Sequence, residues 1–244
     1  MAGSIDKGTD TTGRSAVHGA PVIAIDGPAG AGKSTVAKAI AKRLGFFLLD
    51  TGAIYRAVAL AASRAGVAFS DGEGLAGIAR ALPIRFDESG AVWLGDEDVS
   101  QAIRTPEMSQ GASTVSAHPA VRDALLELQR RLAARGRCVV EGRDIGTVVL
   151  PWAPLKIFLT ASEEVRARRR HEELLARGAQ VDLAATLAEL RQRDDRDINR
   201  PVAPLKQAPD ALLVDTSSLE LESVITRLVE LARERLGPAI SLDQ

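Results

Sequence analysis

The residues with the clearest chemical role form one loop, 27–34, with the sequence Gly-Pro-Ala-Gly-Ala-Gly-Lys-Ser. This sequence matches the pattern G-x-x-x-x-G-K-S/T, in which glycines allow successive backbone N–H groups to point at phosphate oxygens. Lys33 would reach the terminal phosphates, and the Ser34 hydroxyl would bind Mg²⁺. Because an ordinary glycine-rich turn would need neither side chain, the loop predicts binding of a nucleoside triphosphate. The residues expected to contact it are Gly27, Pro28, Ala29, Gly30, Ala31, Gly32, Lys33, Ser34 and Thr35.

Arginines follow two further apolar runs. Arg56 comes shortly after residues 46–50, and Arg143 comes directly after the turn that ends residues 138–141. A guanidinium group stays charged and can bind phosphate through two hydrogen bonds. A single arginine at the end of a strand is usually structural, but two of them beside a phosphate loop favour a second anionic ligand.

Charged residues also cluster in two later segments. Residues 193–200 hold three arginines and three aspartates, and residues 166–170 hold four arginines. Arg166 and Arg170 are four residues apart and share a face of the helix predicted over residues 162–177. One interpretation is a solvated helix surface whose charges pair with each other. The other is that two such helices close over the phosphates and exclude water, and the charge pattern leaves both open.

Phosphate binding does not by itself separate a kinase from a switch GTPase, a motor ATPase or a regulatory nucleotide-binding module. A guanine-reading N-K-x-D sequence is absent, which argues against a GTPase. A motor should carry a long apolar strand with an acidic end, and residues 139–141 form only a short one. A small chain with several arginine clusters favours a kinase that holds two phosphorylated ligands. A kinase for another small acceptor and a regulatory module stay open as alternatives.

The elements that must position these residues are five short apolar runs, 22–26, 46–50, 138–141, 155–159 and 211–215. They show no clean alternation of apolar and polar residues, as expected for strands buried on both faces. Helical patterns lie between or after them, which predicts an α/β fold with a parallel sheet covered by helices. Ligands gather at the carboxyl ends of such strands. Four of the runs end there in an acidic residue, namely Asp26, Asp50, Glu141 and Asp215.

Residues 78–114 depart from this pattern. They contain a predicted hairpin, 84–86 with 92–94, and then an acidic stretch, so we expect a small inserted subdomain. Residues 1–20 have no apolar periodicity and are expected to form a disordered tail. The predicted organisation is a core with the phosphate loop at 21–77, the insertion at 78–114, core at 115–161, a lid region at 162–200, and core with a C-terminal helix at 201–244.

The composition limits the partners. The 31 basic and 32 acidic residues give a formal charge of −1, which offers no case for binding nucleic acid or a membrane surface. No apolar run approaches the roughly 20 residues needed to cross a bilayer, and the N-terminal stretch has no export signal. Cys138 is the only cysteine and lies in an apolar run, so we expect it to be a reduced core residue. We expect a cytoplasmic monomer.

Several separated motifs make the chain, from about Pro21 to Leu236, resemble the bacterial-type cytidylate kinases. These motifs are residues 25–35, 49–56, 141–149, 156–159 and 193–197. The phosphate loop occurs in many families, but the other motifs together do not. The resemblance implies a phosphate-loop kinase core with a five-stranded parallel sheet flanked by helices, a helical lid and a small acceptor-binding subdomain. It also implies Mg²⁺-dependent transfer of the ATP γ-phosphoryl group to CMP or dCMP, giving CDP or dCDP and ADP, in pyrimidine nucleotide metabolism.

The resemblance also implies roles for individual residues. The acceptor phosphate would be held by Arg56, Arg143 and Arg200. The sugar would be held by Thr51, Arg193 and Asp197, and the cytosine by Ser113, Arg122 and Asp144. Arg166 and Arg170 match lid arginines expected near ATP, and the expected catalytic residues are Lys33, Arg143 and Arg170. Some members of the family carry serine at the place of Thr51 and glycine at that of Ser34, and this chain has a hydroxyl at both.

The proposed base contact has a physical consequence for selectivity. Cytosine carries an exocyclic amino donor where uracil carries a carbonyl oxygen. A buried Asp144 carboxylate would accept from the amino group of cytosine but would repel the oxygen of uracil. A repelled or unpaired buried group costs about 1–3 kcal/mol, or roughly ten- to a hundredfold in selectivity. We therefore expect CMP to be preferred over UMP.

Overall fold

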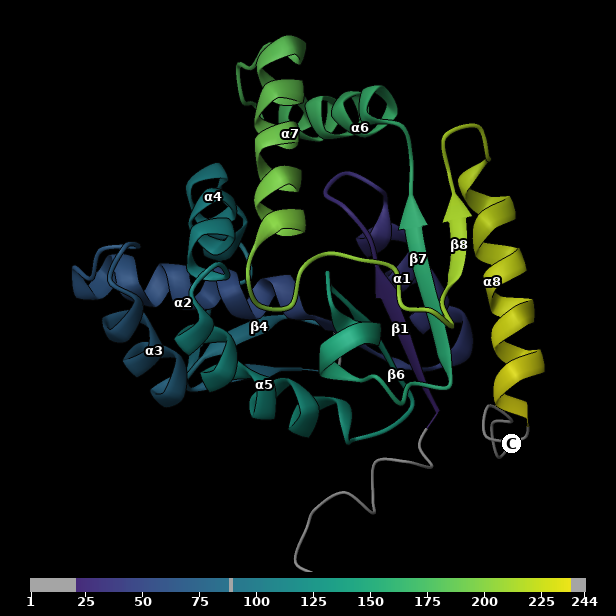
Figure 1. Cartoon of the computed structure of the whole chain (residues 1–244), viewed down its shortest axis with the longest axis horizontal. Helices are drawn as coiled ribbons and strands as arrows, with labels where there is room; N and C mark the ends of the chain where they lie inside the picture. The colour runs from purple at the N-terminus through teal and green to yellow at the C-terminus, as the bar shows by residue number, and fades with distance from the viewer. Residues whose placement is uncertain (1–20, 88–89, 238–244) are drawn as a thin grey trace, which may run out of the picture.

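The computed structural model of the chain describes residues 21–87 and 90–237. The expected tail at residues 1–20 lies outside the described residues. A central sheet carries helices on both faces, and a pair of helices rises beyond one end of its strands (Figure 1). The helices that cover the sheet are α1 (Lys33–Leu44), α2 (Thr51–Ala65), α5 (Pro119–Ala133) and α8 (Leu221–Leu236). Among the described residues, no helix is both long and apolar enough to cross a membrane.

All five strands of the central sheet run parallel, as predicted. They are β1 (Val22–Asp26), β2 (Phe47–Asp50), β6 (Cys138–Glu141), β7 (Leu155–Thr160) and β8 (Leu212–Asp215). Their order across the sheet is β2-β6-β1-β7-β8. The strand that leads into the phosphate loop, β1, therefore lies in the middle of the sheet. Its neighbours are β6, which is followed by Arg143, and β7, which is followed by the predicted lid.

Successive side chains of β1 face opposite sides of the sheet and enter separate cores. Val22 and Ala24 pack in one core with α2 and α5. Ile23 and Ile25 pack in the other core with α1 and α8. A strand that is covered on both faces needs apolar residues throughout. This explains the uninterrupted apolar run, and it fixes the base of the phosphate loop between two packed layers.

A second, smaller sheet lies beside the core. Its strands β3 (Ile84–Phe86) and β4 (Val92–Leu94) form the predicted antiparallel hairpin. A third strand, β5 (Glu97–Asp98), falls in the acidic stretch, where no strand was predicted. The neighbouring helices are α3 (Gly72–Ala81), the short 3-10 helix η1 (Ala102–Arg104) and α4 (Pro106–Val115). The boundaries of the insertion at 78–114 stay a prediction, and α3 extends across the first of them.

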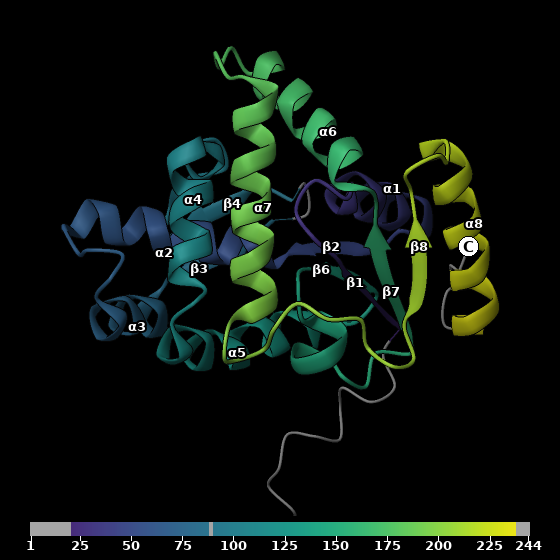
Figure 2. The ribbon, with the colours of Figure 1, turned by 45° about the horizontal axis from the view of Figure 1, so that its top comes forward.

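Two helices, α6 (Glu163–Ala176) and α7 (Leu183–Asn199), pack against each other within the predicted lid region. The Ser162 hydroxyl caps α6 by accepting from the backbone N–H of Val165 at 3.3 Å, as the sequence of that segment indicates. Figures 1 and 2 both place α7 between α6 and α4. The helix pair therefore extends from the end of β7, which α6 follows in the chain, to α4, which α7 contacts.

Candidate functional site

The phosphate loop joins β1 to α1 and depends on three glycines. Gly27, Gly30 and Gly32 have φ angles of 147°, 73° and 88°, which other residues rarely adopt. A Cβ atom on Gly27 would lie 1.9 Å from the carbonyl oxygen of Leu159, because the backbone of β7 passes directly beside the loop. The loop ends where α1 begins, so the positive end of this helix lies at the predicted phosphate site.

Lys33 folds back over the loop. Its Nζ donates a hydrogen bond to the carbonyl oxygen of Pro28 at 2.7 Å, and the residue is buried. Burial, together with the charge of nearby Arg143, lowers the pKa of Lys33 to about 7. A phosphate group beside Nζ would favour the charged form again, because an opposite charge raises the pKa of an amine.

Glu141 faces the phosphate loop, although it was not among the predicted site residues. Ser34 Oγ donates to Glu141 Oε2 at 2.9 Å, and the buried Oε1 has no hydrogen-bond partner among the described residues. Burial raises the pKa of Glu141 to about 7, and the charge of Asp50 adds to this effect. The signal that could have identified Glu141 is its place at the carboxyl end of β6, the strand beside β1.

The Ser34 hydroxyl and the Glu141 carboxylate suit Mg²⁺, which prefers oxygen ligands. Proteins usually hold this ion with one or two carboxylates, and substrate phosphates and water fill its other positions. Within residues 21–87 and 90–237, no group of three or more His, Cys, Asp or Glu side chains could hold a metal by itself. The pair therefore fits an ion that arrives with a nucleotide rather than one held by the protein alone.

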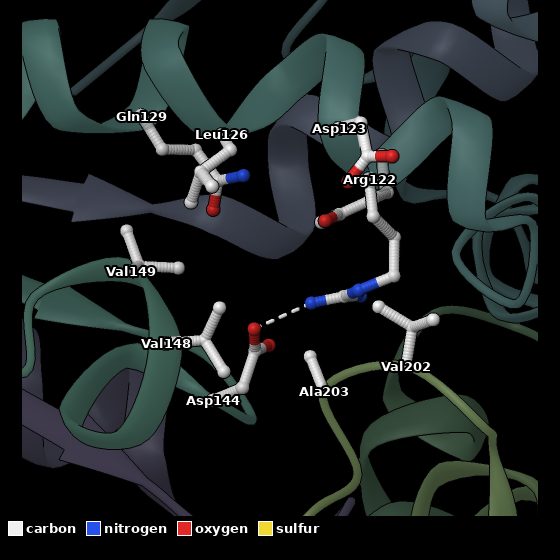
Figure 3. A pocket seen from close by; sticks show the side chains of 10 residues that line it. Arg122, Asp123, Leu126, Gln129, Asp144, Val148, Val149, Val202 and Ala203 are labelled. Atoms are coloured by element: carbon white, nitrogen blue, oxygen red, sulfur yellow. Dashed lines mark hydrogen bonds and ion pairs between the residues drawn. The ribbon is translucent and has the colours of Figure 1, made fainter.

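Asp144 is the centre of a buried cluster on the acceptor side. Arg122 Nη2 donates to its Oδ2 at 2.5 Å, and Arg200 Nη2 donates to its Oδ1 at 3.1 Å. Figure 3 shows Arg122 and Asp144 pointing toward each other beside a cavity of about 30 Å³, which is room for a water molecule. The side chains of Val148 and Val202 also line this cavity. Two of the three residues predicted to read cytosine are thus in direct contact.

Arg143, Arg193 and Asp197 meet where α7 approaches the end of β6. Arg143 Nε donates to Asp197 Oδ2 at 2.9 Å. Burial, and then the charges of Arg143, Arg56 and Arg170, lower the pKa of Arg193 to about 10, although Asp197 opposes the shift. Several arginines are therefore held close enough to repel one another. A bound anion would relieve this repulsion, as expected for a phosphate site.

Thr51 and Arg56 lie in the first turns of α2. Thr51 Oγ1 donates to the carbonyl oxygen of Glu141 at 2.7 Å, which ties the ends of β2 and β6 together. Arg56 Nη2 donates to Asp50 Oδ2 at 2.6 Å, while the other oxygen of Asp50 caps α2 by accepting from the Ala53 N–H at 3.1 Å. The structure thus places both predicted acceptor residues at the polar edge of the sheet.

Buried side-chain atoms without a hydrogen-bond partner are concentrated at these residues. The described part of the chain has seven such atoms, and five of them belong to Arg56, Ser113, Arg122, Glu141 and Arg193. Buried polar groups are nearly always paired in folded proteins, by protein, water or ligand. The unpaired donors of Arg56, Arg122 and Arg193 could therefore each donate to an oxygen of a polar ligand.

The lid arginines contact the loop in a way that the sequence did not indicate. Arg166 is buried, and its Nη1 donates to the carbonyl oxygen of Ala29 at 3.0 Å and pairs with Asp194. The other oxygen of Asp194 accepts from the Ala29 N–H at 3.3 Å, so both lid helices contact the same loop residue. Arg170 instead pairs with Glu173 on its own helix at 2.8 Å. The expected contacts of Arg166 and Arg170 with ATP stay predictions.

Arg169, which was not among the predicted site residues, also lies beside the loop. Its Nη1 donates to Thr216 Oγ1 at 2.9 Å, and its Nη2 donates to the Thr216 carbonyl oxygen at 2.8 Å. Nη1 is 3.8 Å from the position that a Cβ atom on Gly32 would take. Its spacing in the sequence could not separate it from Arg168, which is exposed on the same helix.

Comparisons with known proteins show what the chain is similar to. The family model described as Cytidylate kinase matches residues 23–234. A cytidylate kinase of Geobacter sp. (strain M21) is 52% identical over 219 residues, which cover 88% of this chain and 94% of that protein. A cytidylate kinase of Desulfitobacterium hafniense (strain Y51) is 50% identical over 216 residues, covering 88% and 93%. The solved structure of an uncharacterized protein from Eubacterium ventriosum has a TM-score of 0.51 at 13% identity, covering 88% and 98%, which supports the fold alone.

Proposed function

Since the chain belongs to the cytidylate kinase family, and is therefore a nucleotide-binding phosphotransferase with ATP as co-substrate, we propose how its residues divide between two nucleotides. The phosphate loop and Lys33 bind ATP. The acceptor, CMP or dCMP, lies across the ends of β2 and β6. The observation that supports this division is the row of buried donors, on Arg56, Arg122 and Arg193, that no described residue satisfies.

We propose that catalysis consists of positioning and charge stabilisation. Arg56, Arg143 and Arg200 align the acceptor phosphate, which is already ionised at neutral pH and needs no dedicated general base. Lys33 and Arg170 offset the negative charge that develops on the transferring group, and Ser34 with Glu141 holds the Mg²⁺ that neutralises the phosphates of ATP. Arg166 of α6 donates to the carbonyl oxygen of Ala29, and α7 packs against α6, so both helices lie beside the loop and would keep water away from the transferring group.

We also propose a setting for the reaction. The location is the cytoplasm, which fits a sequence with a single cysteine, Cys138, and therefore no internal disulfide. The product CDP or dCDP places the enzyme in pyrimidine nucleotide metabolism. The acceptor residues described above all come from one chain, which supports a monomer as the active unit.

A coupled ADP-release assay tests the proposed acceptor. With ATP and Mg²⁺, CMP and dCMP are expected to give rapid turnover, UMP slower turnover, and AMP and shikimate none above background. Omission of Mg²⁺ is expected to abolish turnover, because the phosphates of ATP would keep their full charge. Turnover with AMP or shikimate but not with CMP would identify a different acceptor. ATP binding without any acceptor-dependent turnover would instead identify a regulatory module.

The replacement Asp144→Asn is expected to reduce the preference for CMP over UMP by about tenfold. An amide can turn its oxygen toward the amino group of cytosine or its NH₂ toward the carbonyl of uracil, whereas a carboxylate can only accept. The measurement is kcat/KM for both nucleotides at saturating ATP. Asp123→Asn is the matched control, because Asp123 lines the same cavity but is exposed (Figure 3). An unchanged ratio in Asp144→Asn would remove Asp144 from base recognition.

A further inference from the structure

One buried carboxylate has no part in the function described so far. Asp26 ends β1, directly before the phosphate loop, and its residue is 5% exposed. Its Oδ1 accepts from the backbone N–H of Ile145 at 2.8 Å, and its Oδ2 accepts from that of Gly146 at 2.7 Å. Both oxygens are thus used to hold a segment more than a hundred residues further along the chain.

The segment held by Asp26 begins directly after Arg143 and Asp144. Ile145 and Gly146 open a π-helical turn, η2 (Ile145–Val149), which follows the end of β6. Since the two amides belong to the residues next to Asp144, their position sets the course of the backbone from which Arg143 and Asp144 extend. A change of even an ångström in this backbone would misplace groups that must align an acceptor.

The turn has little freedom to move away from Asp26. A Cβ atom on Gly146 would lie 3.1 Å from Lys156 Cδ and 3.4 Å from Asp26 Oδ2. Lys156 is itself fixed, because its Nζ donates to Asp210 at 2.7 Å and to the carbonyl oxygen of Pro151 at 2.6 Å. The glycine lets the backbone of the turn lie directly against the carboxylate, between two anchored side chains.

A carboxylate suits this place better than an amide. The two N–H groups require two acceptor oxygens, which a carboxylate provides and an asparagine side chain does not. Burial raises the pKa of Asp26 to about 6, and the hydrogen bonds from Gly146 and Ile145 oppose that shift. The two hydrogen bonds from the turn therefore favour the charged form of Asp26.

We propose that Asp26 is a positioning residue for the acceptor nucleotide: through the backbone amides of Ile145 and Gly146 it fixes the turn that presents Arg143 and Asp144. This inference rests on the proposed roles of these two residues. In this role the Asp26 side chain links β1, which leads into the ATP-binding loop, to the turn beside the acceptor site, and it contacts neither nucleotide.

The replacement Asp26→Asn separates geometry from charge. Asp26 interacts electrostatically with Lys33 and Asp144, so loss of its negative charge alone would favour binding of both anionic nucleotides. Loss of one acceptor oxygen instead loosens the turn and weakens only the acceptor site. In titration calorimetry with each nucleotide separately, we expect the Kd for CMP to rise about tenfold. The Kd for ATP is expected to stay unchanged or to fall.

Two further variants complete the test. Gly146→Ala keeps the charge of Asp26 but crowds the turn, so it should also weaken CMP binding and leave ATP binding unchanged. Asp96→Asn is the matched control, because it makes the same chemical change at an exposed aspartate of the small sheet and should alter neither Kd. Wild-type CMP affinity in Asp26→Asn, or equal weakening of CMP and ATP, would overturn the proposal. If Asp26→Asn does not fold, Gly146→Ala decides by the same criterion.

The proposed function fails in a different way. It fails when the wild-type protein shows no CMP-dependent release of ADP, whatever the variants bind. Asp26 loses its positioning role when wild-type turnover is normal and Asp26→Asn binds CMP as the wild type does. The two results are therefore distinguishable in one set of preparations.

Discussion

Replacing Lys33 with alanine is expected to lower kcat for phosphorylation of CMP by about a thousandfold, because Nζ would be the cation that contacts the transferring group. The fold should survive. The Lys33 side chain makes one hydrogen bond, to the Pro28 carbonyl oxygen, and removal of a buried ammonium also removes the cost of its desolvation. Steady-state kinetics at saturating nucleotide, with circular dichroism on the same sample, measure both quantities.

Lys38→Ala is the control for this prediction. Lys38 lies on the same helix, α1, but is exposed, so its replacement should leave kcat unchanged. Wild-type kcat in a folded Lys33→Ala protein would sink the role assigned to Lys33. An equal loss of kcat in Lys38→Ala would show that α1 does not tolerate replacement of a lysine by alanine. The loss of kcat in Lys33→Ala would then be structural.

Replacing Arg143 with alanine is expected to lower kcat by about a hundredfold and to raise the KM for CMP. Arg143 would align the acceptor phosphate, and its Nε also donates to Asp197 of α7 at 2.9 Å, so its loss would remove the phosphate contact and a contact to α7. Arg143→Lys should recover only part of the activity, because lysine keeps the charge but cannot form two parallel hydrogen bonds to phosphate. Kinetics with CMP as the varied substrate measure kcat and KM for the wild type, Arg143→Lys and Arg143→Ala, whose activity should fall in that order.

The control for Arg143 is Arg168→Ala, which removes an exposed arginine from α6. It should leave both kcat and KM unchanged. If Arg143→Lys is as active as the wild type, then a positive charge is sufficient at this position. The proposed bidentate alignment of the acceptor phosphate would then be wrong.

The inner strands could be predicted closely from the sequence because burial on both faces of a strand leaves an apolar run, whereas the edge strand β8 has exposed leucines, Leu212 and Leu213, in place of the burial expected of it. Residues 22–26 form such a run, and the structure shows β1 with the same bounds. Strand β5 could not be predicted in this way, because its two residues, Glu97 and Asp98, are exposed and acidic. It forms because β4 offers it a partner, and such pairing depends on the tertiary structure rather than on local preference.

The candidate site was predictable where a motif is contiguous, as in the phosphate loop. Contacts between distant segments were not. A lone acidic residue at a strand end, such as Glu141, looks the same in the sequence whether it faces a loop hydroxyl or a neighbouring helix. Arg166 likewise matched a lid arginine through the family resemblance, while its contacts with Ala29 and Asp194 depend on how the lid packs.

The carboxylates of α7 have a consequence for the rate at which products leave. Asp194 accepts a hydrogen bond from a backbone N–H of the phosphate loop, and Asp197 accepts one from Arg143. Carboxylates of the protein itself thus bind groups that the nucleotides would use. If the nucleotides bind as proposed, each incoming phosphate would compete with an aspartate that is already in place. The aspartates would return when a product departs, so nucleotides would bind more weakly than their contacts alone would give, and product release would limit turnover less.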